Sequence, residues 1–216
     1  MKHLIVLGAS GFAIDLCEFA KESLGYGTDF DIKGFMDKTP CYYEKYNPPY
    51  PYLGYEDNYE IQKDDVFVCA IGQQKIKIDC ITKLKQRNAV FVNLIHKKAY
   101  ISPYSKMGEG NIFFVNTQLG AGAIIGDFNL VQNNAIIAHD CIVGNYNRID
   151  CNVMCVGGIK IGDNTVIHTN SVINHRVCIG DNATVAACSF VTRNVKNNST
   201  VLGNPSKELK FPIINK

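Results

Sequence analysis

IIGDFNLVQNNAIIAHDCIVGNYNRIDCNVMCVGGIKIGD, residues 124–163, carries an apolar residue at every sixth position. The same period continues on both sides, without insertion or deletion, through sixteen positions that are all apolar. In a chain with 46% hydrophobic residues, such a run arises by chance about once in 10⁵ trials. The period is therefore a structural repeat. Its sixteen anchors are Ile101, Met107, Phe113, Leu119, Ile125, Val131, Ile137, Val143, Ile149, Cys155, Ile161, Ile167, Ile173, Ile179, Val185 and Val191.

Small or β-branched residues stand four positions after most anchors, as a tight corner that points inward requires. They are Ser105, Thr117, Ala123, Ala135, Cys141, Val153, Thr165, Ser171, Val177, Ala183, Ser189 and Val195. A second period of 18 is superposed, because Gly recurs at 108, 126, 144, 162 and 180 and Asn at 111, 129 and 147. Three hexads therefore form one coil.

An α-helix cannot use this spacing, because six residues advance it by 600° and spread the anchors around its whole surface. Short flat strands separated by turns can stack their anchors, coil upon coil, into one continuous core. We expect the recurring Gly and Asn residues to occupy the turns, since both tolerate a positive φ. The sequence predicts a triangular parallel β-helix of about five coils.

Composition narrows the possible partners. The 22 Lys and Arg against 20 Asp and Glu give a net charge of +2, too balanced to favour nucleic acid or a membrane surface. Leu4–Leu7 is the only apolar run near Met1 and is too short for a signal peptide or a membrane span. These features predict a cytoplasmic protein, in which the nine cysteines stay reduced and mostly buried.

The N-terminal third reads as alternating strands and helices. The apolar run Leu4–Leu7 leads into Gly8-Ala9-Ser10-Gly11 and then a helical pattern over Phe12–Leu24. Such a turn directs backbone N–H groups outward at a helix N-terminus and suits a phosphate, although a plain strand-to-helix turn has the same pattern. Further strands are expected at 32–37, 66–72 and 90–92 and a helix at 76–87.

Ligands of open α/β sheets bind outside the carboxyl ends of the strands. Six residues fall at these ends and are the predicted substrate-binding set: Gly8, Ser10, Gly11, Asp37, Gly72 and Gln73. The Tyr- and Pro-rich segment Thr39–Tyr59 is expected to be a loop. It is either a surface excursion or a source of aromatic rings that stack on a base or sugar.

The uninterrupted hexads and the closing segment Gly203-Asn204-Pro205-Ser206-Lys207 resemble the left-handed β-helix acyltransferases. Two further motifs, Val92-Asn93-Leu94-Ile95-His96 before Ile101-Ser102-Pro103 and His139-Asp140-Cys141 before Val143-Gly144, resemble the sugar-nucleotide acyltransferases of the NeuD and PglD type. The resemblance implies a Rossmann-like sugar-nucleotide-binding domain at 1–94. It implies a left-handed β-helix with a C-terminal capping tail at 95–216.

The resemblance also implies an activity. Members transfer an acyl group, typically acetyl from acetyl-CoA, to an amine or hydroxyl of a nucleotide-linked amino sugar or sialic-acid-like sugar for surface glycans. A UDP-linked amino sugar is the substrate most expected. Family active sites lie between neighbouring subunits, and a three-sided prism packs readily around a threefold axis, so a homotrimer is expected.

Acyl transfer requires a base for the acceptor's proton, and histidine suits that task near neutral pH. His139 follows anchor Ile137 by two residues, at a corner, and Asp140 can orient it. The resemblance matches these two residues to the catalytic pair. It also places Gly157 against the acyl-CoA, and Arg148 stands where the family has a second histidine that binds the cofactor.

His175 lies two coils along from His139 and is a further candidate for binding substrate or CoA. The CoA phosphates need cations on the later coils, although each candidate can equally be a solvated surface charge. The candidates are Arg176, Arg193, Lys196 and Lys207. No metal is expected. The rival hypothesis is a trimeric scaffold or a metal site like that of the γ-class carbonic anhydrases, which the five histidines fit only loosely.

Overall fold

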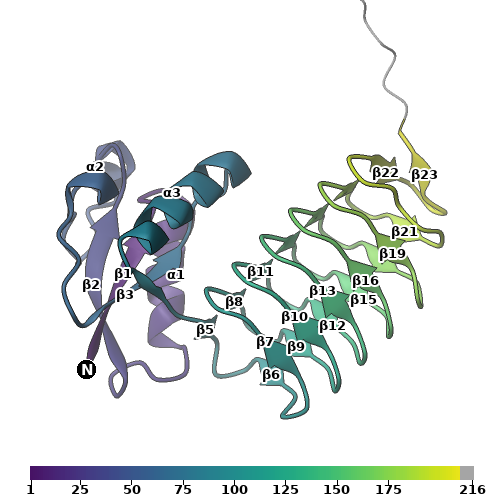
Figure 1. Cartoon of the computed structure of the whole chain (residues 1–216), viewed down its shortest axis with the longest axis horizontal. Coiled ribbons are helices and arrows are strands. Elements are labelled where there is room, and N and C mark those ends of the chain that lie inside the picture. The colour runs from purple at the N-terminus through teal and green to yellow at the C-terminus, as the bar shows by residue number, and fades with distance from the viewer. Residues whose placement is uncertain (210–216) are drawn as a thin grey trace, which may run out of the picture. The chain divides into compact units, whose positions relative to one another are not determined.

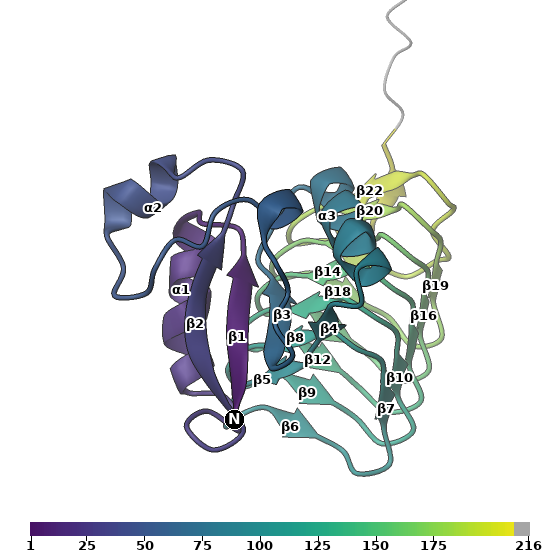
Figure 2. The same ribbon diagram turned by 60° about the vertical axis from the view of Figure 1, so that its left-hand side comes forward.

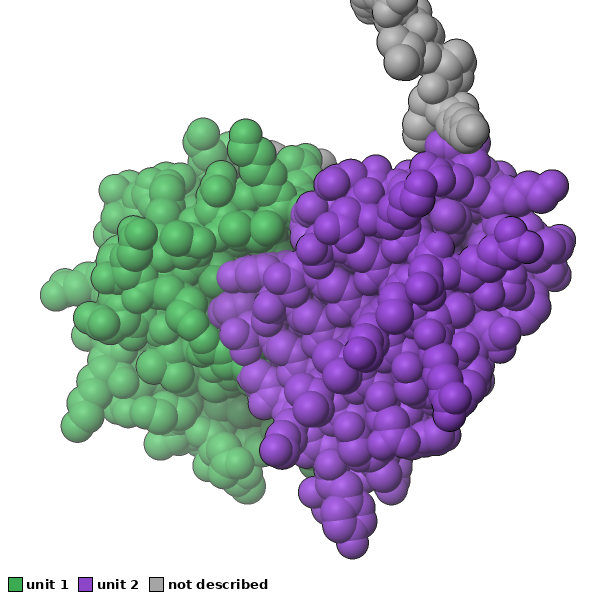
Figure 3. Space-filling model, turned by 45° about the vertical axis from the view of Figure 1, so that its right-hand side comes forward, with its two compact units in different colours: residues 1–97, 109–111 green, residues 98–108, 112–216 purple. Residues whose placement is uncertain are grey.

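The computed structural model describes residues 1–209 and divides into two compact units (Figures 1 and 3). Unit 1 consists of Met1–Lys97 and Glu109–Asn111, and unit 2 consists of Lys98–Gly108 and the chain from Ile112 onward. The last seven residues of the expected capping tail, 210–216, lie outside the described residues. Across residues 1–209, no helix has the length and apolar character needed to cross a membrane.

Unit 1 is built on a parallel sheet with the strand order β2-β1-β3-β4, and Figure 2 shows β2, β1 and β3 side by side. Its elements are β1 (Lys2–Leu7), α1 (Gly11–Lys21), β2 (Phe30–Met36), β3 (Asp65–Cys69), α3 (Gln74–Gln86), β4 (Val90–Phe91) and the short β5 (Leu94–Ile95). The chain first crosses from β1 to β2 and then returns to the other side of β1. Right-handed crossovers therefore put α1 and α3 on opposite faces, and the reversal makes the carboxyl ends of β1 and β3 the expected ligand site.

The strands of unit 1 form where the sequence predicts them. Leu4–Leu7 is completely buried, as expected for a central strand covered on both faces. The helix α1 ends at Lys21, three residues earlier than the apolar pattern indicates. The Leu24 N–H instead donates to the Ile95 carbonyl at 2.8 Å, so tertiary pairing replaces the last helical turn.

The Tyr-rich segment is not a simple loop. It contains the short helix α2 (Cys41–Tyr46) and the 3-10 helix η1 (Glu56–Asn58). Between them the Tyr52 hydroxyl donates to the Asp37 carbonyl at 2.6 Å, and Tyr52 pairs with Phe35 beside β2. The Tyr43 ring packs against the Tyr52 ring at a centroid distance of 5.7 Å. The prediction of a loop missed these elements because aromatic packing against Phe35 is a tertiary effect.

A buried carboxylate fastens the end of this segment to the sheet. The Asp65 side chain is fully buried and accepts hydrogen bonds from Lys33 Nζ at 2.6 Å, the Tyr59 hydroxyl at 2.7 Å and the Gln62 N–H at 2.8 Å. Burial by itself raises the pKa of Asp65, but these donors together outweigh it and hold the pKa below its usual value.

Unit 2 is a left-handed parallel β-helix whose two-residue strands form three sheets (Figure 1). The β7 sheet contains β7 (Lys106–Met107), β10 (Ile124–Ile125), β13 (Ile142–Val143), β16 (Lys160–Ile161) and β19 (Cys178–Ile179). The β8 sheet contains β8 (Ile112–Phe113), β11 (Leu130–Val131), β14 (Arg148–Ile149), β17 (Val166–Ile167), β20 (Thr184–Val185), β22 (Thr200–Leu202) and β23 (Lys207–Glu208). The β6 sheet contains β6 (Tyr100–Ile101), β9 (Gln118–Leu119), β12 (Ile136–Ile137), β15 (Met154–Cys155), β18 (Val172–Ile173) and β21 (Phe190–Val191).

The hexad anchors form the core as predicted. From Phe113 to Val191 every anchor is buried, while Ile101 and Met107 of the first coil are half-buried. Strands pair in a register of 18 residues, as in Ile125 with Val143, until the last coil, where Thr184 pairs with Thr200 after 16. The antiparallel pair β22–β23 then closes the last coil, which agrees with the expected capping segment.

The turn residues differ from the expectation. Positive φ occurs at other rows, mainly Asn116, Asn134, Asn152, Asn164, Asn170 and Asn182. The recurring Asn129 and Asn147 instead point inward and are buried, where the Asn129 Oδ1 accepts the Asn147 N–H at 2.8 Å. The expectation failed because a sequence shows which residue recurs at a turn but not which of the turn residues takes the left-handed conformation.

The recurring glycines provide space between coils. A Cβ on Gly126 would lie 2.3 Å from Asn145 Oδ1, and one on Gly144 would lie 2.2 Å from Asp163 Oδ1. These side chains accept backbone N–H groups of the preceding coil, at 2.8 Å for Asp127 to Asn145 and 2.7 Å for Asn145 to Asp163. The glycine row therefore makes room for a ladder of side-chain acceptors.

Gly144→Ala should lower the free energy of unfolding by about 1–3 kcal/mol, because overpacking of this order follows when a methyl group must displace the Asp163 carboxylate. The control is Gly72→Ala, where a Cβ would meet no atom within 4 Å. Urea unfolding followed by circular dichroism measures both. Equal stability of the two variants would show that the glycine row has no spacing role.

Asp65→Ala should destabilise unit 1 by about 1–3 kcal/mol at pH 7, since three donors lose their acceptor. Because the folded pKa is depressed, the carboxylate stabilises the fold fully above the unfolded pKa of about 3.9, and this contribution disappears as the pH falls through the folded value. The wild-type stability curve should therefore fall more steeply in acid than that of the variant. Tyrosine fluorescence during urea titration at several pH values tests this, and parallel curves would contradict it.

Candidate active site

One edge of the β-helix collects four of the predicted site residues. This His139 edge consists of His139, Gly157, His175 and Arg193, each two residues after an anchor of the β6 sheet. Successive coils are bonded there: the Gly158 N–H donates to the His139 carbonyl at 2.9 Å, and the Arg176 N–H approaches the Gly157 carbonyl at 3.4 Å. With about 4.8 Å per coil, the edge spans about 14 Å from His139 to Arg193.

His139 and Asp140 form a pair at the turn from β12 to β13. Asp140 has a φ of 58°, and its N–H donates to the Ala121 carbonyl of the preceding coil at 3.0 Å. This conformation directs its carboxylate back to His139, with Oδ2 2.8 Å from Nδ1. Because a carboxylate only accepts, the hydrogen bond requires the proton on Nδ1 and leaves the lone pair on Nε2. Both side chains are exposed, at 63% and 71%.

Gly157 lies directly against the imidazole. It is buried, and a Cβ built on it would lie 2.5 Å from both Cε1 and Nε2 of His139. Its φ is not positive, so the backbone would accept another residue there and only the ring excludes it. Gly157 is therefore needed for space, a role that the sequence did not indicate.

Cations gather at the far end of the edge. Arg193, Lys196 and Lys207 line one cavity of about 440 Å³, together with Ser199 and Ser206 and the carboxylate of Glu208. The antiparallel pairing of β23 with β22 brings Lys207 there. Three of the four cations named from the sequence thus share one cavity, and Arg176 lies on the His139 edge beside Gly158.

Arg148 lies elsewhere. It is on the β8 sheet, whereas His139 is at the corner between the other two sheets, so the prism separates them within one chain. Its guanidinium forms an ion pair with Asp150 at 2.9 Å and approaches His168 Nδ1 at 3.2 Å, and His168 Nδ1 is 3.0 Å from Asp150. This cluster was not expected from the sequence, although the spacing of 18 residues between Asp150 and His168 places the two on neighbouring coils.

In unit 1 the strand ends converge on a second site. Gly8, Ser10, Asp37, Gly72 and Gln73 line an open cavity of about 200 Å³, and Gly11 begins α1 beside it. Five of the six predicted substrate residues therefore meet.

Two features of this second site were not foreseen. The Asp37 Oδ2 accepts the Ala9 N–H at 2.8 Å and thereby holds the glycine turn. Tyr46 of α2 reaches the turn as well, with its hydroxyl 3.1 Å from the position of a Cβ on Gly11. The sequence analysis missed Tyr46 because its segment was expected to be a loop.

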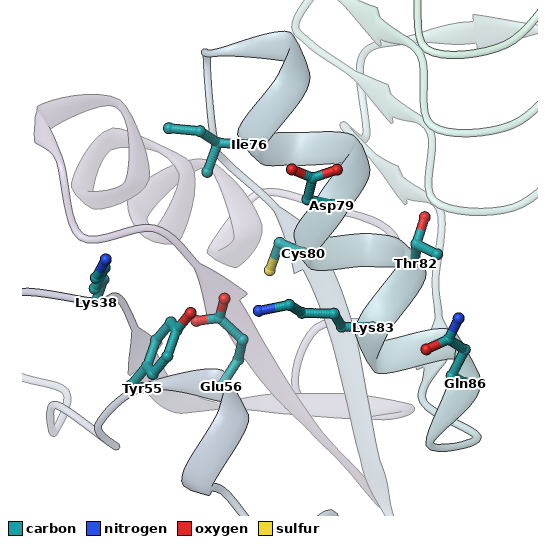
Figure 4. A pocket seen from close by; sticks show the side chains of 9 residues that line it. All are labelled: Lys38, Tyr55, Glu56, Ile76, Asp79, Cys80, Thr82, Lys83 and Gln86. Atoms are coloured by element: carbon teal, nitrogen blue, oxygen red, sulfur yellow. The ribbon is translucent and has the colours of Figure 1, made fainter.

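The cavity continues away from the glycine turn. An adjoining cavity of about 90 Å³ is lined by Gly8 and Asp37 on one side and by Tyr55 and Glu56 on the other. It adjoins a groove of about 490 Å³ between η1 and α3, shown in Figure 4, with which it shares Tyr55, Glu56 and Cys80. We call these three adjoining spaces the unit 1 groove. Tyr55 is one of the aromatic residues of the segment 39–59 that could stack on a ligand, whereas no sequence signal identified Glu56, because it follows no motif and reaches the groove only through the path of η1.

Within the described part of the chain, neither a metal-binding cluster nor a reactive buried thiol accompanies these two sites. Among the side chains that the structure describes, no three of His, Cys, Asp or Glu group together as metal ligands would. Burial raises the pKa of the Cys17 thiol to about 12, and it also raises that of Cys155. These thiols are neutral and unreactive at physiological pH, as expected for buried cysteines.

Residues 158–193 match the family model of the bacterial transferase hexapeptide, six repeats. These residues are hexapeptide repeats of the bacterial transferase type. The match covers two coils and includes His175 and Arg193 of the His139 edge. An uncharacterized protein of Acanthamoeba polyphaga mimivirus is 31% identical over 105 residues, which are 47% of this chain. The chain covers only 20% of that protein's length.

Solved structures match this chain over both units. The acetyltransferase domain of PglB from Neisseria gonorrhoeae is 25% identical with a TM-score of 0.83, and the match covers 97% of this chain and 100% of that domain. WeeI from Acinetobacter baumannii gives the same identity, coverage and TM-score. Perosamine N-acetyltransferase from Caulobacter crescentus, in complex with CoA and GDP-perosamine, shares the fold at 20% identity, with a TM-score of 0.84 and 98% coverage of both chains. The expected fold class is therefore confirmed.

Gly157→Ala should displace the His139 ring and reduce kcat for acyl transfer at least about 10-fold, since small misplacements of catalytic groups have large effects on rate. The stability should change little, because Gly157 has no positive φ. In a His139→Ala background, Gly157→Ala should cause no further loss of kcat. Steady-state kinetics of the two single variants and the double variant measure this, and additive losses would show that Gly157 acts independently of the ring.

Proposed function

We propose that this protein is an acyl-CoA-dependent acyltransferase that acetylates an amine or hydroxyl of a nucleotide-linked sugar. The observation that carries the proposal is the His139–Asp140 pair, with Nδ1 held at 2.8 Å from the carboxylate and the ring seated on Gly157. This arrangement leaves Nε2 as a positioned proton acceptor on an exposed edge.

The reaction follows from that nitrogen. Nε2 removes a proton as the acceptor's nitrogen or oxygen attacks the thioester carbonyl carbon. The tetrahedral intermediate collapses when the carbon–sulfur bond breaks, and the imidazolium returns the proton to the leaving thiolate. Asp140 stabilises the imidazolium while it exists. Each step uses one base and needs no second titrating group.

The His139 edge suits the other substrate, acetyl-CoA. An extended pantetheine arm can follow the edge from the imidazole toward the last coil, past His175. Arg193, Lys196 and Lys207 at that end offer cations to the CoA phosphates, and the backbone N–H of Gly157 can donate to the thioester oxygen. The gonococcal PglB acetyltransferase domain, which has the same fold, has been solved in complex with acetyl coenzyme A.

Unit 1 suits the acceptor. The glycine turn at the N-terminus of α1 offers backbone donors to a diphosphate, and Ser10 caps the helix without using its hydroxyl. Asp37, Gly72 and Gln73 face the same cavity and can contact the ribose or the sugar. The perosamine enzyme of the same fold binds a nucleotide-linked amino sugar. A role in surface glycan synthesis is consistent with such a substrate.

We also propose a homotrimer. Arg148, if it contacts the acyl donor at all, can do so only from a neighbouring subunit, because the β8 sheet is opposite the corner that carries His139. Packing three prisms around a threefold axis brings the corner of one subunit to a face of the next. The cluster of Arg148, Asp150 and His168 would then border the His139 edge of the adjacent copy.

His139→Ala should reduce kcat about 10²–10⁴-fold, the usual contribution of a general base. The matched control is His3→Ala, because His3 Nδ1 is also 2.8 Å from a carboxylate, that of Asp31, but lies at the start of β1. Release of free thiol from acetyl-CoA, together with the mass gain of a nucleotide-sugar acceptor, measures both variants. If the His139→Ala variant turns over at the wild-type rate, His139 is not the base.

A further inference from the structure

One cavity of the unit 1 groove suits a nucleobase. If the diphosphate lies at the glycine turn, as the proposed function requires, the base must extend along the groove past Asp37. The next cavity has apolar walls formed by Ile71 and Ile76, and Tyr55 contributes an aromatic ring. A planar base can pack between such surfaces, and its hydrogen-bonding edge then faces η1.

Two carboxylates line this inner cavity, and they differ in their hydrogen bonds to the backbone. Asp37 accepts the Ala9 N–H at 2.8 Å and approaches the Thr39 N–H at 3.4 Å, so it lies at the glycine turn, on the side of the ribose and not of the base. Glu56 is half-buried and turns its carboxylate toward Cys80, as Figure 4 shows. Burial, the Cys69 thiol and the Glu56 carboxylate all raise the pKa of Cys80, so its thiol stays protonated and is a weak donor that a ligand can replace.

The chemistry of the bases distinguishes what Glu56 can bind. Guanine presents two adjacent donors, N1–H and N2–H, which match the two oxygens of a carboxylate. Uracil and thymine present one donor between two carbonyl oxygens, and these oxygens would repel a carboxylate. Cytosine offers a single exocyclic donor. Lys38 lines the same cavity and can donate to O6 of guanine, which lies on the same edge.

We infer that the nucleotide is guanine-linked and that Glu56 is the residue that selects guanine, with Lys38 as its partner for O6. This inference rests on the proposed function and makes its substrate class specific. The expectation of a UDP sugar came from a family resemblance alone and did not include η1. The Tyr-rich segment would then have a role in substrate recognition, because the path of this segment brings Glu56 to the groove.

The test is calorimetric titration of the full chain with GDP, UDP and CDP, without an acceptor sugar or acetyl-CoA. GDP should bind at least about 10-fold more tightly than UDP. Glu56→Gln should weaken GDP binding about 10- to 100-fold, because one oxygen that accepts from guanine becomes a donor. The same substitution should leave UDP binding unchanged or improve it, because the repulsion of its carbonyl oxygens is removed.

The matched control is Asp57→Asn. Asp57 is the adjacent carboxylate, but it pairs with Lys83 at 3.1 Å and does not line the groove, so its substitution should leave the GDP-to-UDP ratio unchanged. Thermal unfolding of both variants verifies that they fold.

UDP binding as tight as GDP binding, or an unchanged ratio in Glu56→Gln, overturns the guanine assignment and leaves the nucleotide-sugar function intact. If acetyl-CoA binds the same sample but no nucleoside diphosphate does, the proposed acceptor site fails and the guanine assignment fails with it.

Discussion

The structure of unit 2 depends on one constraint, the backbone hydrogen bonding of each coil to the next at a fixed register. Ile136 donates to the Val153 carbonyl at 2.8 Å and Ile142 to the Ile159 carbonyl at 2.9 Å, and this pattern repeats along the prism. Each residue then lies about 4.8 Å from its counterpart 18 positions away. A side chain is tolerated only if it can stack on that counterpart or if the counterpart leaves room for it. The anchors, the inward Asn and Thr residues and the acceptor ladder over the glycine row all satisfy this condition.

The candidate catalytic pair exploits the same constraint at one point where the repeat is broken. Most corners stack similar residues, but the His139 edge places an imidazole above a glycine. That step lets the ring lie close against Gly157 of the next coil while Asp140, in the left-handed conformation, reaches back to Nδ1. The rigid stack thereby fixes the orientation of an exposed side chain that would otherwise sample several rotamers.

Unit 1 uses carboxylates for two different purposes. Asp65 is buried and serves the fold, because its three donors fasten the Tyr-rich segment to β3. Asp37 serves both the fold and the site, since it holds the glycine turn in the conformation that exposes the backbone donors. Glu56 has no comparable task in holding the backbone, and its place in the groove is best explained by a ligand. The reversal of strand order between β1 and β3 is what brings these elements to one end of the sheet.

The sequence by itself determined the β-helix, its register and its core, because a period of six with apolar anchors has only one way to bury them. It also determined the members of the His139 edge, since residues 18 apart lie on the same edge of successive coils. It determined most of the second site, since the carboxyl ends of parallel strands lie at one edge of the sheet. Only the tertiary structure decided which turn residues take a positive φ, why Gly157 cannot be larger, and that Arg148 faces away from His139. It alone placed Tyr46, Tyr55 and Glu56 beside the glycine turn. These features arise from contacts between segments with no common period, and a linear pattern contains no information on how such segments meet.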